Sequence, residues 1–327
     1  GVRLVGSEMC IRDSTKYCIL DEKGKIHYDK IVSGVCRVPD SSYSELTDKD
    51  SYYVFKDKKY LIGDLSSMLM ESPIDVMSYE GYKEVSAVIT SYMLHIHRNY
   101  NIDEIRLGLT PAMWEKKDEY LDYICDELGL PKEKVAIKIQ GLSGHQCYKK
   151  YGIDPSSDEN QSQYISENYV GLDIGHNTLD FYIVLDGKVL DYGIKGYLKK
   201  GACIITDNIK KFVKEEHGYD LNDVEAKAVL NTGLLKRRRR VFDLKSNVNR
   251  FILDYLESTL DLVEKEYGVQ LDKVDQILIF GGGGEIIKLA CESSEEFKKQ
   301  IEELYGDGYL QIPRVASSFY NSIGYVL

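Results

Sequence analysis

The residues whose types and spacing could do chemistry are densest at positions 171–180. Asp173 ends a run of apolar residues with strand character, and Gly175 and Asn177 follow in a turn that lets backbone N–H groups converge. Such a nest binds the anionic oxygens of phosphate. A carboxylate at the strand end suits a magnesium ion held through its waters, and the Thr178 hydroxyl can add a contact. The segment therefore predicts a phosphate and magnesium site.

The same segment has a simpler interpretation. An ordinary β-hairpin with an exposed acid has the same pattern, because short glycine turns are common. On this segment alone both interpretations stay open. Asp180 lies two residues beyond Thr178 on the return strand, on the same side. It could complete a water network there, or it could be a structural partner of the turn.

A second candidate site is the run of four glycines that follows the apolar residues 276–280. Successive glycines are costly in backbone entropy, and the usual gain is a close approach of the main chain to a flat or charged ligand. An adenosine moiety fits such a surface, whereas a bare strand-to-helix turn would need only two glycines. The spacing is not a Rossmann fingerprint, because no acidic strand end follows about 20 residues later in a βαβ unit. The candidate contacts are Gly281, Gly282, Gly283, Gly284 and Glu285.

The elements that must position these residues repeat along the chain. In the first half the pattern predicts strands at 17–20 and 26–32, a hairpin at 52–63, a helix at 85–97, a strand at 105–109, a helix at 113–128 and a strand at 135–139. In the second half it predicts strands at 169–173, 179–185 and 188–192, helices at 203–216, 223–230 and 246–267 with Ser246 as N-cap, a strand at 276–280 and a helix at 317–325. Each half opens with strand, turn, strand, turn, strand. This weak duplication predicts two similar lobes, which form a cleft if they face each other.

Residues 151–166 are polar and almost without periodicity, so they predict a mobile connector and a domain boundary. We expect a first lobe at 15–166 with a small β-rich insert near 31–75. A second lobe is expected at 167–313, and a C-terminal helix at 314–327 should return to the first lobe.

The first 14 residues differ from the rest of the chain. Residues 6–14 show neither strand alternation nor a helical stripe, and their run Glu-Met-Cys-Ile-Arg-Asp resembles the translation of a sequencing adapter. We therefore expect residues 1–14 to be an artefact that replaces the true start, and we exclude them from the predicted fold. A natural but irregular tail is the alternative.

Together the two glycine segments, their order and the duplicated lobes resemble the actin-like ATPase superfamily over Thr15–Leu327. Within it, the closest similarity is to the ParM/StbA family of plasmid-segregation actins. Residues 173–180 are similar to the family's second phosphate loop, 281–287 to its adenosine motif and 319–325 to its terminal helix. The resemblance implies an α/β, actin-like (ribonuclease H-like) two-lobed fold, with duplicated mixed β-sheets flanked by helices and a nucleotide cleft between the lobes.

The resemblance also implies cofactors and roles for residues. The cofactors are ATP (or GTP) and Mg²⁺, with Asp173 as the metal residue and Gln140, Asp173 and Asp180 as catalytic residues. Gln140 would align a water for in-line attack, although a loop amide that caps a neighbouring turn is an equal alternative. The implied cofactor contacts are Thr15, Lys16, Gly175, His176, Asn177, Thr178 and the residues 281–285.

One part of the family pattern is missing. The family's first phosphate loop has an Asp-x-Gly ahead of a Thr-Lys, and here only Thr15-Lys16 is found. This is the expected result if adapter sequence replaced the true start, and the chain would then lack half of its phosphate clamp. The helix with Glu225 and Lys227 corresponds, by the same resemblance, to one that lines the adenine and ribose pocket.

Composition narrows the class of partner. The 327 residues exceed the roughly 250–300 of a single core, and no apolar run approaches the roughly 20 residues that span a bilayer. The net charge of -11 opposes nucleic-acid phosphates, so we expect a DNA partner to be reached through an adaptor rather than directly. Seven scattered cysteines without a C-x-x-C pair indicate reduced thiols in a cytoplasm. The basic run 236–240 could contact an acidic neighbouring subunit or phosphate, although a solvated loop is the simpler interpretation.

The resemblance implies an actin-like ATPase that binds and hydrolyses Mg-ATP and polymerises into filaments for plasmid or phage DNA segregation. Two other functions stay open. A small-molecule kinase of the same fold would need a base and a substrate pocket in the first lobe, where no His or Asp signature is found. A nucleotide-binding module without turnover would fit the missing first loop.

Overall fold

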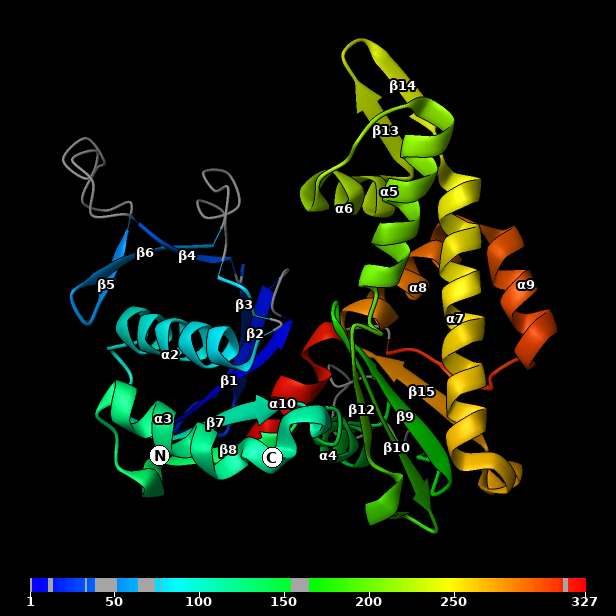
Figure 1. The fold of residues 1–327 in the computed structure, drawn as a ribbon. Coiled ribbons are helices and arrows are strands. Elements are labelled where there is room, and N and C mark those ends of the chain that lie inside the picture. The colour runs from blue at the N-terminus through cyan, green and yellow to red at the C-terminus, as the bar shows by residue number, and fades with distance from the viewer. Residues whose placement is uncertain are drawn as a thin grey trace. The chain divides into compact units, whose positions relative to one another are not determined.

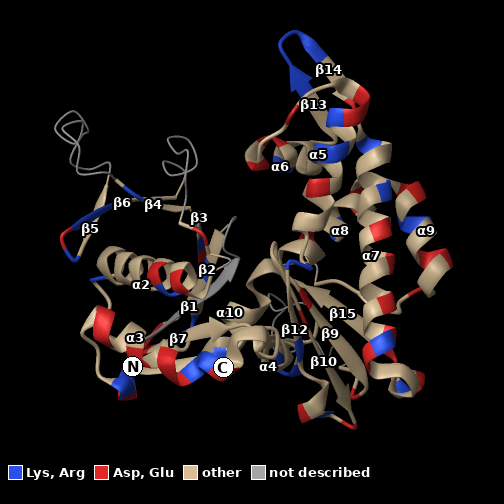
Figure 2. Ribbon diagram, in the orientation of Figure 1, with Lys and Arg blue, Asp and Glu red and all other residues tan. Residues whose placement is uncertain are grey.

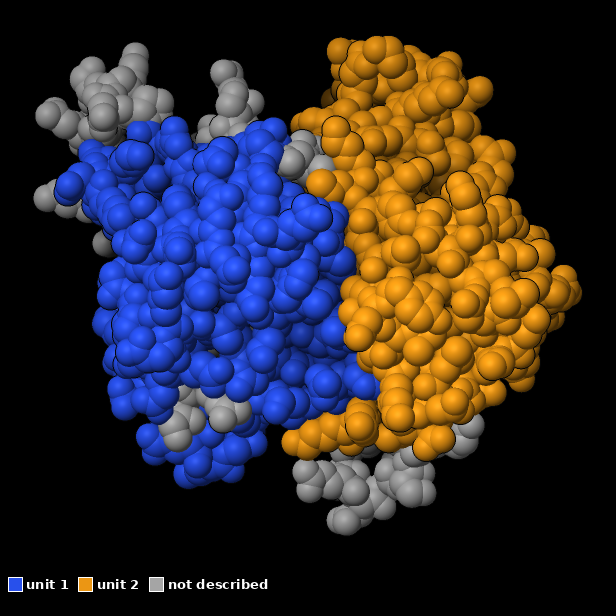
Figure 3. All heavy atoms as spheres, turned by 60° about the horizontal axis from the view of Figure 1, so that its bottom comes forward, with its two compact units in different colours: residues 1–147, 319–327 blue, residues 148–318 orange. Residues whose placement is uncertain are grey.

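The computed structural model describes residues 2–10, 14–32, 34–38, 52–63, 74–76, 78–153, 165–313 and 317–327 (Figure 1). Two compact units share the chain (Figure 3). Unit 1 comprises Gly1–Cys147 with Phe319–Leu327, and unit 2 comprises Tyr148–Ser318. The division falls inside helix α4 (Ser143–Tyr151), which the sequence patterns did not predict. Much of the expected connector, residues 154–164, lies outside the described residues.

Unit 1 is built on a five-stranded mixed sheet in the order β3-β2-β1-β7-β8. The three strands β1, β2 and β3 pair antiparallel, and β1, β7 and β8 pair parallel. The strands are β1 (Val2–Cys10), β2 (Ser14–Leu20), β3 (Ile26–Val32), β7 (Ile102–Leu109) and β8 (Val135–Ile139). A separate three-stranded sheet comprises β4 (Val35–Arg37), β5 (Tyr53–Phe55) and β6 (Lys58–Ile62), in the order β4-β6-β5.

The helices of unit 1 cover its sheet and close its core. They are α2 (Tyr79–Ile96), α3 (Lys117–Leu128), the first part of α4, and α10 (Tyr320–Val326), with short 3-10 turns η3 (Pro111–Lys116) and η4 (Lys132–Lys134). The 3-10 turn η7 (Ser317–Phe319) spans the second division between the units. Helix α2 begins earlier than position 85 because the Ser78 hydroxyl accepts the N–H of Gly81 and caps it. Helix α10 packs on β1 and β2, and Cys18 donates to Ser322 there.

Strand β1 corrects our expectation for the start of the chain. Residues 2–10 pair antiparallel with β2 and parallel with β7, so they belong to the sheet that we expected to form without them. The lack of alternation misled the prediction, because strand pairing uses backbone groups that every residue carries. The pairing register with β2 shifts between Gly6 and Glu8, where the adapter-like run begins.

Unit 2 repeats the topology of unit 1. Its sheet has the order β11-β10-β9-β15-β16, with β12 also paired to β10. Here too the first strand pairs antiparallel with the second and parallel with the strand that follows the helices. The strands are β9 (Tyr169–Ile174), β10 (Thr178–Leu185), β11 (Lys188–Val189), β12 (Lys195–Leu198), β15 (Gln276–Phe280) and β16 (Leu310–Gln311). The predicted internal duplication is confirmed, although the strand expected at 188–192 stops at Val189 and a 3-10 turn, η5 (Asp191–Gly193), follows.

Five helices pack against the sheet of unit 2 and against each other. They are α5 (Cys203–His217), α6 (Asp223–Thr232), α7 (Lys245–Tyr267), α8 (Gly281–Ser293) and α9 (Glu295–Tyr305), with a 3-10 turn η6 (Gly268–Lys273) after α7. Helix α6 starts with a capping box between Asn222 and Glu225. The prediction of Ser246 as a cap was wrong, because α7 starts at Lys245 after the buried Leu244 and has no side-chain cap.

The basic run forms a hairpin rather than the loop that we favoured. Strands β13 (Leu234–Arg237) and β14 (Arg240–Asp243) pair antiparallel just before α7. The run of charges hid the alternation, in which Leu235 is buried and Phe242, directly opposite, packs against the same core.

No helix among the described ranges is both long and apolar enough to cross a membrane.

Candidate functional site

The two glycine segments begin at neighbouring strand ends of unit 2. Strands β9 and β15 run parallel, and their register pairs Asp173 with Phe280. The bend after β9 and the glycine run after β15 therefore leave the sheet at the same edge. The carboxyl edge of parallel strands is where ligands bind in open α/β sheets.

Two buried carboxylates lie at this edge. Asp173 and Asp180 are 0% and 1% exposed, and they face each other in the β9–β10 register. Directly opposed residues of an antiparallel pair point to the same face of the sheet, where two negative charges repel. A cation between them would remove the repulsion, and carboxylate oxygens are the ligands that Mg²⁺ prefers. Groups of three or more metal-ligating side chains are not found in the described part of the chain, so water or phosphate would supply the remaining ligands.

The glycine run packs directly on the Asp173 bend. Gly281 has φ +82°, and a Cβ there would lie 2.5 Å from Asp173 Oδ1 and 2.7 Å from the Ile174 carbonyl oxygen. A Cβ on Gly283 would lie 2.1 Å from Cγ2 of Ile174. Only glycine permits this backbone conformation and this approach. The structure thus brings the two predicted segments into contact, and it makes residues 281–284 the first turn of α8 rather than a loop.

Gly282 differs from its neighbours. Among the described atoms, none lies within 4 Å of the Cβ that Gly282 would carry. Packing explains the glycines at 281 and 283, and in part the one at 284, whose Cβ would lie 3.0 Å from the Ile279 carbonyl oxygen. Packing does not explain Gly282, which leaves open backbone beside the carboxylate pair. Glu285 follows it as an exposed residue of the same turn.

The bend at 175–178 is fixed by its own hydrogen bonds and by the start of α5. The N–H of Gly175 donates to the Thr178 carbonyl oxygen at 2.9 Å, so this amide is used inside the bend. The carbonyls of Gly175 and His176 accept from Ala202 and Cys203 at 2.9 and 2.7 Å. The positive end of the α5 dipole therefore lies against the bend.

Gly201 makes this docking possible, and the sequence patterns missed it. A Cβ on Gly201 would lie 2.5 Å from the carbonyl oxygens of both Gly175 and His176. The signal was a Lys-Lys-Gly run directly before a predicted helix. The exposed Lys199 and Lys200 add positive charge to this segment, and the Tyr255 hydroxyl donates to the Lys200 carbonyl at 2.9 Å. Burial raises the pKa of Tyr255, which keeps its proton for this bond.

Asn177 supplies a donor that the protein leaves unused. The side chain is 7% exposed, and its Nδ2 has no hydrogen-bond partner within the described residues. A buried amide donor without a partner is costly, and an acceptor supplied by a ligand would remove that cost. The donor lies in the bend against which the N-terminus of α5 packs, so an oxygen of an anionic ligand such as phosphate fits it.

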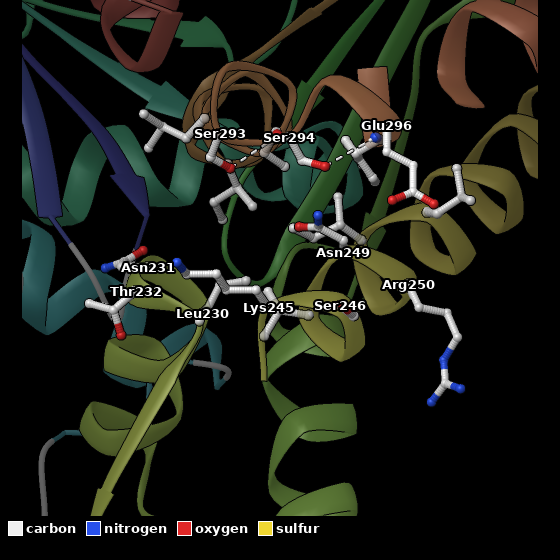
Figure 4. A pocket seen from close by; sticks show the side chains of 18 of the residues that line it. Leu230, Asn231, Thr232, Lys245, Ser246, Asn249, Arg250, Ser293, Ser294 and Glu296 are labelled. Atoms are coloured by element: carbon white, nitrogen blue, oxygen red, sulfur yellow. Dashed lines mark hydrogen bonds between the residues drawn. The ribbon is translucent and has the colours of Figure 1, made fainter. Parts of the chain in front are cut away.

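A pocket of about 650 Å³ lies beside the glycine turn in unit 2, between α6, α7, α8 and α9 (Figure 4). One wall is α8, where lining begins at Ile286, about 7 Å along the helix axis from Gly281. Figure 4 shows Asn249 of α7 opposite Ser293 and Ser294 across the pocket. Neither Glu225 nor Lys227 lines it, and Glu225 instead pairs with Arg237. The C-terminal end of α6 contributes Thr232 in their place.

The remaining predicted residues belong to unit 1. Thr15 and Lys16 are buried in β2, opposite Met9 and Glu8 of β1. Gln140 is buried directly after β8, and its N–H donates to the Leu109 carbonyl at 2.9 Å. The sheet order puts all three at one edge, where β7 and β8 end and β2 begins. The structure therefore groups the predicted residues into two sets, one in each unit.

Comparison with known proteins supports this fold. Residues 171–292 match the profile of the C-terminal part of archaeal MreB-like actin homologues. An archaeal actin homolog is similar with a TM-score of 0.67 and 15% identity, covering 99% of this chain and 98% of its own. A ParM from a 15-stranded filament of Clostridium botulinum has a TM-score of 0.70 and 16% identity, covering 99% and 97%.

A third similar structure is Bacillus thuringiensis ParM with ATP, with a TM-score of 0.60 and 16% identity, covering 99% of this chain and 97% of its own. No curated protein sequence matches the chain. At these identities the structural similarity shows the fold alone. The chain has the actin-like fold, and it resembles ParM filament proteins and archaeal actin homologues.

Proposed function

We propose that unit 2 holds the phosphates of ATP and a Mg²⁺ ion at the edge where β9 and β15 end. The observation that carries the proposal is the contact between Gly281 and Asp173, which puts an open glycine turn beside two buried carboxylates. The unused Nδ2 of Asn177 and the α5 N-terminus add positive character to the same bend. A metal and a phosphate together satisfy both the acids and the donors.

Each residue of the bend has a distinct proposed role. Asp173 holds Mg²⁺ through its waters, Asp180 orders the waters around it, and the Thr178 hydroxyl adds a contact. His176 and Gly175 shape the bend, and Gly282 lets the main chain approach the nucleotide. The nucleoside occupies the pocket beside α8, whose volume suits a small ligand.

In unit 1, Gln140 would align the attacking water, and Thr15 and Lys16 would complete the phosphate contacts. A glutamine can position water without acting as a strong base, and positioning dominates phosphoryl transfer.

We further propose that the nucleotide controls assembly into filaments, which act in plasmid or phage DNA segregation in the cytoplasm through a DNA-bound adaptor. The likeness to ParM from a filament supports the self-association.

Calorimetric titration tests the nucleotide site. We expect ATP to bind in the presence of Mg²⁺ and more weakly in EDTA, and we expect phosphate release and sedimentable polymer with ATP but not with ADP. Titration with GTP gives the base preference. A chain that binds neither nucleotide in the presence of Mg²⁺ contradicts the proposal.

Nucleotide binding without turnover is a second candidate, favoured by one observation in unit 1. Strands β1 and β2 pair up to Cys10 and Ser14, in the segment to which the resemblance to ParM assigns the first phosphate loop, and no Asp-x-Gly precedes Thr15-Lys16 there. ATP binding with no phosphate release above the background would favour this candidate over the hydrolase.

A further inference from the structure

The hairpin β13–β14 carries a cluster of cations that the chain itself leaves unneutralised. Arg237 is paired with Glu225. Its neighbours are exposed and make no salt bridge within the described part of the chain: Lys236, Arg238, Arg239 and Arg240. Arg240 lies directly opposite Arg237, an arrangement of like charges that destabilises a strand pair. Figure 2 shows this basic hairpin as a blue ribbon beyond the start of α7.

The basic hairpin also has an apolar component. Val241 lies opposite Lys236 in the hairpin register and is 61% exposed. An exposed apolar side chain within a cluster of unpaired cations is a mixture found at protein interfaces, where arginine is enriched. The basic hairpin therefore has the composition of a contact surface rather than of a solvated tip.

A stripe of acids runs along the exposed side of α7. Its members are Asp254, Glu257, Asp261 and Glu264. Their spacing of three, four and three residues puts them on one face of the helix, where like charges repel. All four are exposed, and none makes an ion pair with a described residue. The acidic stripe covers about 15 Å of helix.

The basic hairpin and the acidic stripe of one copy cannot meet. The hairpin precedes α7, and Asp254 lies about 13 Å along the helix from its first residue, with the rest of the stripe further on. Figure 1 shows the hairpin at the opposite end of α7 from η6. The basic hairpin can therefore pair with an acidic stripe only if the stripe belongs to a second molecule.

We propose that the basic hairpin binds the acidic stripe of a second copy of this chain. The acidic stripe gives a second copy a local surface of opposite charge and similar extent, which is the reason to favour a copy of the chain as the partner, while the net charge of -11 opposes nucleic-acid phosphates. The two surfaces differ, so a copy bound through its hairpin alone still has a free stripe, and a head-to-tail contact of this kind repeats from copy to copy. This inference uses one part of the proposed function, namely that copies of the chain associate with each other.

Charge reversal tests the contact. The hairpin variant is Arg238→Glu with Arg239→Glu and Arg240→Glu, and the stripe variant is Asp254→Lys with Glu257→Lys and Asp261→Lys. The control for the hairpin variant is Lys23→Glu with Lys25→Glu and Lys30→Glu, three exposed lysines of unit 1 with the same change in charge. Sedimentation velocity at low and high salt, with and without Mg-ATP, measures association.

We expect the wild type and the control to associate and each interface variant to lose at least tenfold in association constant. An equal mixture of the two variants should recover association, because each reversed surface then meets a reversed partner. A monomeric wild type at low salt with Mg-ATP, a hairpin variant that associates normally, or a mixture that does not recover would overturn the proposal. Loss of binding to a DNA duplex by the hairpin variant, with self-association intact, would assign the hairpin to nucleic acid instead.

Titration of ATP into the same samples separates this inference from the proposed function. Recovery in the mixture without any ATP binding keeps the contact and contradicts the nucleotide site. ATP binding without recovery keeps the nucleotide site and contradicts the contact.

Discussion

The two units share one sheet topology but end their central strand differently. In unit 2, β9 stays paired with β15 as far as Asp173 and then turns through a glycine bend. In unit 1, β1 pairs with β7 only as far as Val5, shifts register after Gly6 and continues with β2 alone up to Cys10. One unit opens its sheet edge into a bend, and the other extends it as a hairpin.

The difference shows that the shared topology gives each unit the same sheet edge, and that the residues at the bend determine whether this edge can bind a ligand. The edge in unit 2 has glycine at each close approach, two buried acids and an unused amide. The edge in unit 1 keeps the buried Thr15 and Lys16 inside a strand. Changes at the bends should therefore have effects that the shared topology does not predict.

The largest expected effect is that of Gly281→Val. The side chain would meet Asp173 Oδ1 and the Ile174 carbonyl and would also be strained at φ +82°. We expect the free energy of unfolding to fall by about 3 kcal/mol, from the sum of backbone strain and overpacking. Urea unfolding followed by circular dichroism measures it.

Gly24→Val is the matched control in unit 1. Gly24 has φ +77°, and no described atom lies within 4 Å of its Cβ position. Only the backbone strain remains there, about 1–2 kcal/mol. Equal losses at the two sites would show that the close approach to Asp173 contributes nothing.

Asp173→Asn should have opposite effects on stability and on binding. Removal of one of two facing buried charges is expected to stabilise the protein without ligand, while the affinity for Mg-ATP falls about thirtyfold, or about 2 kcal/mol. Thermal unfolding and calorimetry measure the two effects. Asp186→Asn, in the turn between β10 and β11, is the control and should change neither by much. If Asp173→Asn lowered both the stability without ligand and the affinity for Mg-ATP, the role of Asp173 would be structural.

The comparison is sharpened by copying the bend of unit 2 into unit 1. Replacement of residues 7–13 by the sequence of residues 173–177 puts an aspartate, with a glycine two residues later, at the end of β1, which has no such pair. We expect about a tenfold gain in affinity for Mg-ATP, or about 1.4 kcal/mol, together with a rise in phosphate release. The same replacement in the Asp173→Asn background should give a smaller gain. No gain in either chain would contradict a role for unit 1 in binding.

The smallest expected effect is that of Gly282→Ala. Open space surrounds this position among the described residues, so the free energy of unfolding should rise slightly, by less than about 1 kcal/mol, from the higher helix propensity of alanine. The affinity for ATP should fall a few-fold if the main chain approaches the ligand here. Unchanged affinity would limit Gly282 to a structural role.

Much of the fold follows from periodicity. The strands at 135–139 and 276–280 match the prediction at both ends, because each is a short apolar run bounded by polar or glycine residues. The prediction missed α9 and the basic hairpin, where charges dominate and few residues face the core: Phe297 and Ile301 in α9, and Leu235 and Phe242 in the hairpin. The search for periodicity also excluded β1, because strands pair through their backbone groups and pairing does not require alternating polar and apolar side chains.

The site was predictable in part. Asp173 and Gly281 stand out in sequence, but their contact depends on the parallel register of β9 with β15, which no local pattern gives. The sequence did not indicate the importance of Gly201 for the same reason. A Cβ at this position would clash with the carbonyl oxygens of Gly175 and His176, which lie about 25 residues earlier in the chain. Long-range packing, not local propensity, selects these residues.

Hydrogen exchange tests most directly whether the two glycine bends form one site. On titration with Mg-ATP, peptides covering residues 171–180 and 280–286 should gain protection together, with one half-saturation concentration. The peptide covering residues 234–243 should not change at protein concentrations too low for assembly. Protection of only one bend, or of each at a different ATP concentration, would contradict a shared site.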